Sequence, residues 1–326
     1  MEKFLSCDWG TSTFRLRLIQ SKDFVVLAEE SSEEGISRSF MLWKQSRQRE
    51  EERLFFYLRI IKDHIHRIET QLKYSLKGTP VIVSGMASSS LGMLELPYKP
   101  LPFQLDGSGL EISSFEPSGF FNHEMMMISG CKTNDDVMRG EETKIVGCSP
   151  DSKVHEELYI FPGTHSKHVK VTAGKVEHFR TFMTGEFFEL LTTHSILSNC
   201  VEKTGWADHE ENRIGFELGV MDSLHSNLLQ SAFWVRTNDL FEKLSREENY
   251  FYLSGLLIGY EIRELDNQAP LPVTIVSDNF LGPLYEEALR IPKKNGEKRN
   301  FKRADADRSL IKGQYRIYKS KNKSGK

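Results

Sequence analysis

Long apolar runs are missing from this sequence. The apolar segment FYLSGLLIGY at 251–260 has only ten residues, about half of what a membrane-spanning helix needs. The first ten residues, MEKFLSCDWG, hold no apolar core of a secretory signal. We therefore expect a cytoplasmic protein that does not contact the membrane.

Paired cysteines are also missing. The four cysteines, Cys7, Cys131, Cys148 and Cys200, are far apart and form no CxxC pair. This spacing favours neither a disulfide framework nor a zinc site. We expect them to be small buried hydrophobic residues.

No large excess of one charge is present, because 43 Lys and Arg residues face 46 Asp and Glu residues and the net charge is -3. The basic residues gather near the end, with 14 of them in 290–326 against three acidic ones. This stretch lacks the interleaved aromatic residues of a single-strand binder. A solvated last helix explains it better than a nucleic-acid arm, so we expect no nucleic-acid partner.

With 326 residues, of which 39% are apolar, the chain can bury a large core, and its length favours two domains. The segment CDWGTSTFRLRLIQ (7–20) predicts two strands joined by the polar link Gly10-Thr11-Ser12-Thr13, and FVVLAEES (24–31) predicts a third strand. The beginning of the chain is thus expected to be a β-meander with a hydroxyl-rich first turn.

A second segment repeats this pattern. ELYIFPGTHSKHVKVTAGKVEHFRTFMTG (157–185) predicts three strands, with Gly163-Thr164-His165-Ser166 in the first turn. Each copy is followed by helical patterns and another apolar strand, TPVIVSG in the first half and PVTIVSD in the second. This duplication predicts an α/β chain of two similar lobes around a central cleft.

The two glycine–threonine turns suit phosphate binding, because glycine lets the backbone approach, and exposed N–H groups and hydroxyls donate to phosphate oxygens. Only the first copy has an acid at the strand end, Asp8, where the second copy has Phe161. One carboxylate, with water, is what a phosphate-bound Mg²⁺ usually needs. Asp8 is the candidate metal ligand, although Asp and Gly also form ordinary hairpin turns.

A third cluster is DDVMRGEETKIVGC at 135–148. As a helix, it would place Met138, Glu141, Glu142 and Ile145 on one stripe. Buried carboxylates are costly unless they are paired or used. Two interpretations stay open: a salt bridge from Arg139 to one of the glutamates, or a general base.

The strings DWGTST, VMRGEET, PGTHSK, TFMTGE, HSIL and YLSGLLIG occur in this order. In these strings the chain, from about residue 4 to about 290, resembles the 2-dehydro-3-deoxygalactonokinases, a branch of the actin-like sugar-kinase and Hsp70 ATPase superfamily. The resemblance implies two ribonuclease-H-like (actin-like ATPase) lobes. It also implies ATP-dependent phosphorylation, with Mg²⁺, of the terminal hydroxyl of 2-dehydro-3-deoxy-D-galactonate to the 6-phosphate.

The resemblance also assigns residues. Gly140-Glu141 is placed like the Gly-Asp of the related glycerol kinases, which makes Glu141 the first choice of base and Glu142 the second. Arg139 could bind the sugar acid's carboxylate through its planar fork. The phosphate turns correspond to Gly10, Thr11, Ser12 and Thr13 and to Gly163, Thr164, His165 and Ser166; Asp8 lies near the metal; the substrate loop keeps Gly85, Met86 and Ser88.

We expect a first lobe at about 1–150 and a second lobe at 151–326, with the last helix a candidate to cross back. The expected partner is a small sugar acid, and a homodimer is an open alternative to a monomer. A second function, a catalytically weak sensor that binds a sugar acid or nucleotide, is favoured by Ser277, Asp278 and Asn279, which stand where the family has glycine near the nucleotide base.

Overall fold

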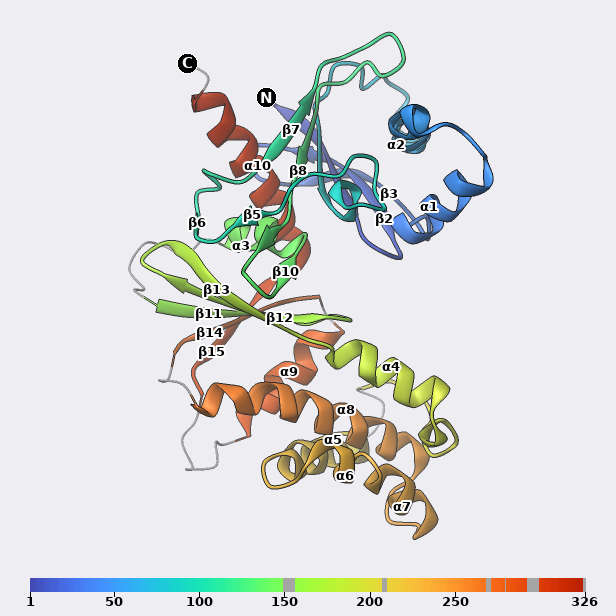
Figure 1. The fold of residues 1–326 in the computed structure, drawn as a ribbon, viewed down its shortest axis with the longest axis vertical. Helices are drawn as coiled ribbons and strands as arrows, with labels where there is room; N and C mark the ends of the chain where they lie inside the picture. Colours follow the sequence, from blue (N-terminus) through green and yellow to red (C-terminus); the bar gives the residue numbers. More distant parts are fainter. Residues whose placement is uncertain (149–155, 207–209, 268–270, 279, 292–298, 325–326) are drawn as a thin grey trace. The chain divides into compact units, whose positions relative to one another are not determined.

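The computed structural model describes residues 1–148, 156–206, 210–267, 271–278, 280–291 and 299–324 (Figure 1). The chain forms two compact units. The first contains Met1–Val154, Thr172–His178 and Ala306–Lys326, and the second contains His155–Val171 and Phe179–Asp305. The last segment of the chain therefore groups with the first unit.

The first unit contains a six-stranded sheet in the order β3-β2-β1-β4-β8-β7. β1 pairs with β2 antiparallel and with β4 parallel. The strands of this unit are β1 (Lys3–Trp9), β2 (Phe14–Gln20), β3 (Val26–Ser32), β4 (Val81–Gly85), β7 (Ile112–Phe115) and β8 (Met125–Ile128), with the short strands β5 (Lys99–Pro100), β6 (Phe103–Gln104), β9 (Cys131–Lys132) and β10 (Val137–Met138). The helices are α1 (Ile36–Gln45), η1 (Glu50–Glu52), α2 (Arg53–Leu72), η2 (Met86–Ser88), α3 (Glu141–Cys148) and α10 (Ala306–Ser324).

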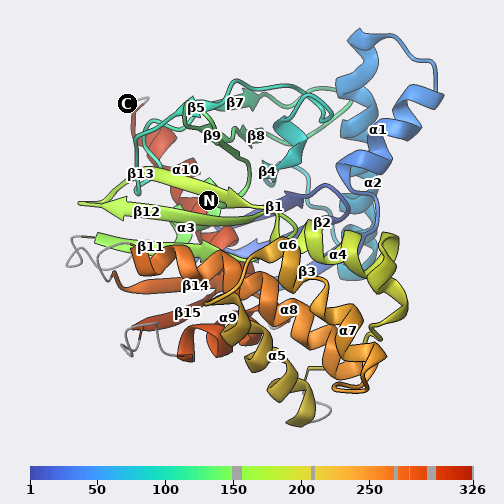
Figure 2. The ribbon, with the colours of Figure 1, turned by 60° about the horizontal axis from the view of Figure 1, so that its bottom comes forward.

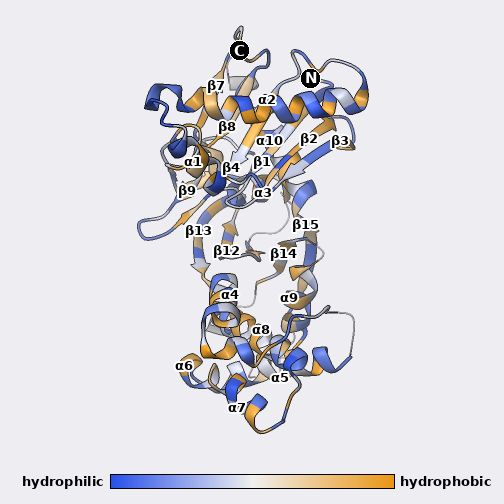
Figure 3. Cartoon of the chain, turned by 90° about the vertical axis from the view of Figure 1, so that its right-hand side faces the viewer, coloured by the Kyte–Doolittle hydropathy of each residue, from blue (hydrophilic) through white to orange (hydrophobic). Residues whose placement is uncertain are grey.

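Helix α2 covers the core of this sheet because its apolar residues recur at helical spacing. Figure 3 shows both apolar and polar stretches along it. Leu58, Ile61, Ile65 and Ile68 are buried at this spacing, and Leu54 is half-buried against the same core. At about 0.8 kcal/mol per buried CH₂ group, such a stripe stabilises the helix far more than its intrinsic propensity does.

The second unit repeats the strand order. Figure 2 shows β13, β12, β11, β14 and β15 in this sequence across the sheet. β11, β14 and β15 are parallel neighbours. These five strands of the sheet are β11 (Glu156–Phe161), β12 (Ser166–Thr172), β13 (Lys175–Phe182), β14 (Val273–Ser277) and β15 (Phe301–Asp305), of which the segment Thr172–His178 groups with the first unit. The helices are α4 (Thr184–His194), η3 (Ile196–Asn199), α5 (Glu210–Ser223), α6 (Leu228–Ser231), α7 (Trp234–Leu240), α8 (Arg246–Ile262), η4 (Arg263–Asn267) and α9 (Leu281–Arg290).

Helices α5 and α8 pack closely because glycines face each other across the contact. A Cβ atom at Gly219 would lie 2.1 Å from the Tyr252 carbonyl oxygen, and one at Gly255 would lie 2.0 Å from the Phe216 carbonyl oxygen. Ser245 and Glu248 form a capping box that begins α8. This pair of helices supports one face of the candidate site described below.

The duplicated meander predicted from the sequence is confirmed, since β1–β3 and β11–β13 each precede a parallel strand, β4 or β14. Cys7, Cys131 and Cys200 are buried, as expected, and Cys148 is half-buried. Among the described residues, no helix combines the length and apolar character that a bilayer-spanning helix needs.

The helix predicted over 135–148 is wrong in its first half. Val137 and Met138 belong to β10, which pairs with β9, and the helix begins only at Glu141. Gly140 has φ +110°, a conformation that favours glycine and ends any helix running through it. Met138 is therefore not on one helical stripe with Glu141 and Ile145.

Candidate active site

The first predicted phosphate turn joins β1 to β2. The Gly10 N–H donates to the Thr13 carbonyl (2.9 Å), and the side chains of Thr11, Ser12 and Thr13 are exposed. The Ile36 N–H, at the start of α1, donates to the Gly10 carbonyl. The turn thus lies at a helix N-terminus, where backbone dipoles favour an anion.

Asp8 is half-buried near the end of the central strand β1. Parallel pairing places Trp9 opposite Gly85, and a Cβ atom at Gly85 would lie 2.7 Å from the Trp9 carbonyl oxygen and 3.5 Å from Asp8 Oδ1. Arg15 lies opposite Asp8 on β2, yet its guanidinium donates to Asp307. Within the described part of the chain, the Asp8 carboxylate has no hydrogen-bond or ion-pair partner.

Glu141 and Glu142 begin α3 next to this strand end. Gly140 approaches Gly85 so closely that a Cβ atom on it would lie 3.7 Å from the Gly85 Cα atom. Glu141 is half-buried and accepts the Arg139 N–H (3.1 Å). Asp8 and the start of α3 therefore both lie close to Gly85, within one unit.

Glu142, in contrast, is fully buried and accepts the Gly140 N–H (2.7 Å) and the Thr143 hydroxyl (2.9 Å). Burial, and then the charge of Glu141, raise the pKa of Glu142 to about 7, although these hydrogen bonds oppose the shift. Its carboxylate is engaged inside the protein rather than presented to a ligand.

Arg139 does not form the salt bridge that one interpretation expected. Its Nη1 donates to the Ser88 carbonyl (2.6 Å) and hydroxyl, and its guanidinium lies 4.2 Å from the Tyr98 ring centroid. In the described ranges no ion pair joins it to Glu141 or Glu142. Ser88 is buried and also donates to the Ile128 carbonyl (2.8 Å), whereas Met86 is half-buried beside it.

The second predicted phosphate turn joins β11 to β12. Thr164 and His165 are exposed, and Gly163 has open space where a Cβ atom would stand. Helix α4 begins beside this turn: the Glu186 N–H donates to the Thr164 carbonyl (3.0 Å), and Gly185 lies against the Gly163 carbonyl. Ser166 differs from the rest, because it is fully buried and its hydroxyl donates to Glu261 (2.6 Å).

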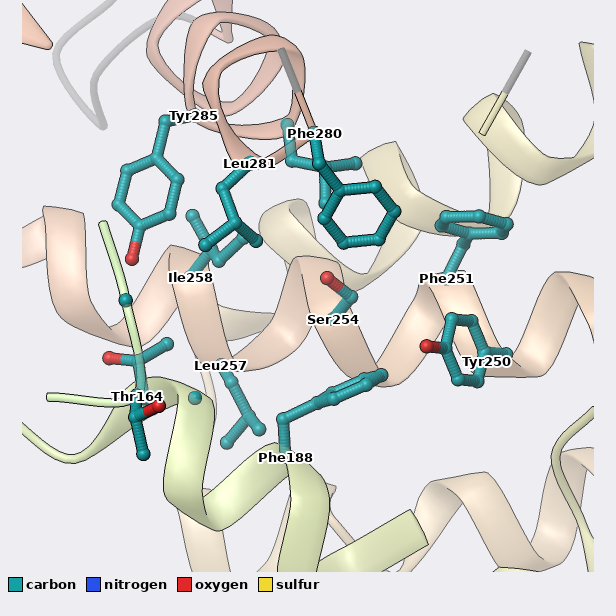
Figure 4. A pocket seen from close by; sticks show the side chains of 14 residues that line it. Thr164, Phe188, Tyr250, Phe251, Ser254, Leu257, Ile258, Phe280, Leu281 and Tyr285 are labelled. Carbon is teal, nitrogen blue, oxygen red and sulfur yellow. The ribbon is translucent and has the colours of Figure 1, made fainter. Parts of the chain in front are cut away.

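A pocket of about 220 Å³ opens next to this turn, within the second unit. Figure 4 shows Phe280 and Phe188 on opposite sides of it, with the Ser254 hydroxyl between them. None of the fourteen described residues that line it carries a charge. The pocket suits a flat apolar ring system such as a nucleotide base.

The segment that departs from the family pattern borders this pocket. Ser277 ends β14, and Asp278 Oδ1 accepts the N–H groups of Phe280 (3.0 Å) and Leu281 (3.2 Å) at the start of α9. Asn279 lies outside the described residues. The Asp278 side chain, which caps α9, and the Phe280 ring thus stand in the segment where the family has glycine. The pocket forms in spite of this departure, and Phe280 lines it.

Several lining residues were missed by the sequence analysis. Phe188, Phe280 and Tyr285 gave no pattern that separates a pocket from a core. Ser254, Leu257 and Ile258 lie in the YLSGLLIG string, whose role was not assigned. Glu261 does not line the pocket, but the sequence does mark it: a single carboxylate in an otherwise apolar part of a helix indicates a buried charge that needs partners.

In the described ranges, no three His, Cys, Asp or Glu side chains are grouped as a metal site. A Mg²⁺ ion that arrives with a nucleotide needs less, because phosphate oxygens and water supply most of its ligands. The unpartnered Asp8 carboxylate fits that need. The structure thus offers one carboxylate, two glycine–threonine turns and one apolar pocket.

Comparison with known proteins agrees with the predicted resemblance. A family model for 2-keto-3-deoxy-galactonokinase matches residues 8–317. The 2-dehydro-3-deoxygalactonokinase of Escherichia coli (strain K12) is 28% identical over 295 residues, which cover 88% of this chain and 89% of that protein. A protein of Rhizobium meliloti (strain 1021), named as a probable 2-dehydro-3-deoxygalactonokinase DgoK1, is 30% identical, with 95% and 94% covered.

A crystal structure of a Sinorhizobium meliloti protein that bears the 2-dehydro-3-deoxygalactonokinase name is also similar. It is 28% identical, with a TM-score of 0.78, over 97% of this chain and 98% of that one. The predicted actin-like α/β fold and the predicted resemblance are confirmed. The chain belongs to the 2-keto-3-deoxy-galactonokinase family.

Proposed function

We propose that this chain is an ATP-dependent kinase that phosphorylates the terminal hydroxyl of 2-dehydro-3-deoxy-D-galactonate to the 6-phosphate. The observation that carries the proposal is the extent of the family match, which spans 8–317 and so includes Asp8, both glycine–threonine turns and Glu141. A kinase of this kind needs positioned phosphates, neutralised charge and a base rather than covalent catalysis. A reaction that consumes ATP also supports the cytoplasm as its location.

The pocket of the second unit supports ATP as the donor. Its apolar lining, with Phe188 and Phe280 on opposite sides, suits the adenine base. Gly163 and Thr164 line the same pocket, so a base held there would leave its phosphates near the turn. The N-terminus of α4, which lies against that turn, favours negative charge.

Asp8 would hold the Mg²⁺ of Mg-ATP, with water and phosphate as the other ligands. When bound, the ion neutralises phosphate charge. Thr11, Ser12 and Thr13 support the same assignment, because their exposed hydroxyls follow Asp8 in the first turn. Arg15 does not compete for Asp8, since Asp307 takes its guanidinium.

Glu141 is the better candidate for the base that takes the proton of the sugar hydroxyl. A base must lie within hydrogen-bond reach of that proton. Glu141 is half-buried, whereas the Glu142 carboxylate is fully buried and engaged with Gly140 and Thr143. Arg139 supports carboxylate recognition, because its buried Nε–H has no partner in the described residues and Nη1 alone is used by Ser88.

The test is an ADP-release assay with Mg-ATP, with and without 2-dehydro-3-deoxy-D-galactonate. Phosphorus NMR of the product would locate the new phosphate ester. ADP release that requires the sugar acid, with a phosphate on the terminal oxygen, is the expected result. Binding of the sugar acid without any phosphoryl transfer would overturn the kinase in favour of a sensor.

A further inference from the structure

Glu261 is a buried carboxylate at the end of α8 with four hydrogen-bond donors around it. It is 2% exposed. Its Oε1 accepts the Ser166 hydroxyl (2.6 Å) and His168 Nε2–H (2.8 Å), and its Oε2 accepts the Tyr285 hydroxyl (2.7 Å) and the Thr184 hydroxyl. All five residues belong to the second unit.

These donors come from three different elements around the phosphate end of the pocket, which is the end where Gly163 and Thr164 lie. Ser166 ends the second glycine–threonine turn and His168 follows it on β12. Thr184 is the first residue of α4, and Tyr285 lies on α9. Thr184 and Tyr285 also line the pocket, as do Gly163 and Thr164 of the turn.

The four donors fit a charged carboxylate. Burial alone would raise the pKa of Glu261, but the hydrogen bonds from His168, Ser166 and Thr184 outweigh it and hold the pKa below its usual range. The ring of His168 is held by Phe182, at a centroid distance of 4.5 Å. A network of this kind is strong when every member is satisfied and costly when one is removed.

We propose that Glu261 is a positioning residue for the nucleotide: its carboxylate fixes the turn 163–166 to α4 and α9 and so sets the phosphate end of the pocket before ATP binds. The inference rests on the proposed function, which assigns this turn to the nucleotide phosphates. Glu261 touches neither substrate, and it acts through Ser166, Thr184 and Tyr285. It lowers the cost of binding because the turn is already ordered.

The chain offers a matched control in Glu157. This carboxylate is also 2% exposed and lies in the second unit. It accepts the Tyr159 hydroxyl (2.9 Å) and the Thr274 hydroxyl, and pairs with Lys302 (3.0 Å). None of its partners lines the pocket, so its loss disturbs the same sheet without touching the turn.

The experiment compares Glu261→Gln with Glu157→Gln in the full chain. Calorimetric titration with Mg-ADP gives the Kd, assays give the KM of each substrate and kcat, and thermal unfolding gives the Tm. Glu261→Gln should raise the Kd of Mg-ADP and the KM of ATP by about tenfold, the worth of one hydrogen bond to a charged group. The KM of the sugar acid should stay within about twofold of that of the natural chain, because neither Glu261 nor its hydrogen-bond partners are among the residues proposed to bind the sugar acid. Glu157→Gln should lower the Tm without changing the Kd of Mg-ADP.

Equal losses of nucleotide affinity in both variants, or none in Glu261→Gln, would overturn the proposal. If Glu261→Gln does not fold, His168→Ala and His168→Gln replace it: the first removes a donor to Glu261 and should weaken Mg-ADP binding, while the second keeps an N–H donor and should restore it. Unchanged binding in His168→Ala would then overturn the proposal. Failure of the proposed function is separate, since the natural chain itself would then not bind Mg-ADP.

Discussion

Glu141 and Glu142 are adjacent residues in very different surroundings, and this difference predicts different effects of the same substitution. Glu141→Gln removes the proposed base while it keeps the size and most hydrogen bonds of the side chain. We expect kcat to fall by about 10²–10⁴-fold, the usual contribution of general-base catalysis. The Kd of Mg-ADP should not change, because Glu141 is not part of the nucleotide pocket. Steady-state assays and calorimetric titration measure the two quantities.

The control is Glu51→Gln, a substitution at an exposed carboxylate of η1 in the same unit. It should leave kcat unaltered. Normal turnover in Glu141→Gln would remove Glu141 from the role of base, and a parallel loss in the control would indicate a general effect of charge.

For Glu142 we predict an effect on stability that depends on pH. The pKa of Glu142 is about 7 in the folded protein, against an ordinary value of 4.5. Between these pH values the folded chain keeps a proton that the unfolded chain loses, so the free energy of unfolding falls as pH rises. This contribution is complete below the ordinary pKa and is lost by about pH 7.

Glu142→Gln is neutral at every pH and escapes this loss. Relative to the natural chain, the variant should gain about 2–3 kcal/mol in the free energy of unfolding between about pH 5 and about pH 8. Urea titrations at a series of pH values measure the difference. A difference that stays constant with pH, as expected for Glu51→Gln, would contradict the raised pKa.

At the residue scale, local chemistry was readable from the sequence, whereas partners distant along the chain were not. Asp8 and the hydroxyls of 11–13 were singled out because their types and spacing suit phosphate, and the structure leaves them exposed or half-buried. Ser166 was grouped with them, yet its hydroxyl points to Glu261, 95 residues further along the chain. No local pattern contains that contact.

At the element scale, the strands and α2 were predictable because burial on one face imposes a period of two or 3.6 residues. The segment 135–148 shows where this reasoning fails. Met138, Glu141 and Ile145 have helical spacing by coincidence, because Met138 faces the core from a two-residue strand. Only the positive φ of Gly140 separates strand from helix, and a sequence does not state which glycines adopt it.

The contact between α5 and α8 gives a prediction at this scale. Gly219→Ala would place a methyl group 2.1 Å from the Tyr252 carbonyl oxygen, so the helices must move apart. We expect the free energy of unfolding to fall by about 1–3 kcal/mol, as for other overpacked contacts. Urea unfolding measures this loss. Gly119→Ala is the control, because nothing lies within 4 Å of its Cβ position, and the two variants should not be equally stable.

For the whole molecule, the duplicated meander was visible in the sequence because both copies keep the same order of strands and turns. The last helix was expected as a candidate to cross back, but the residues that it contacts could not be read from the sequence, because they lie nearly the entire chain away. Asp307 of α10 accepts hydrogen bonds from Arg15 (2.8 Å) and Arg17 (2.6 Å) of β2, 292 and 290 residues away. Gln314 donates to the Cys7 carbonyl (3.0 Å) and Ser84 hydroxyl (2.9 Å). The strands β1, β2 and β4 of the first unit therefore make all of these contacts only after α10 has been synthesised and has packed against them.

This closure has a consequence for the proposed metal ligand. Arg15 lies directly opposite Asp8, where side chains share one face of the sheet, and Asp307 holds the Arg15 guanidinium away. Asp307→Asn should release Arg15 to pair with Asp8, so the Mg²⁺ concentration that gives half-maximal activity should rise by about tenfold, while kcat at saturating Mg²⁺ stays unchanged. Because Asp307 is half-exposed, the free energy of unfolding should fall by only about 1 kcal/mol. A magnesium titration of Asp307→Asn beside Asp63→Asn, an exposed aspartate of α2, tests this, and equal magnesium responses would show that Arg15 does not compete for Asp8.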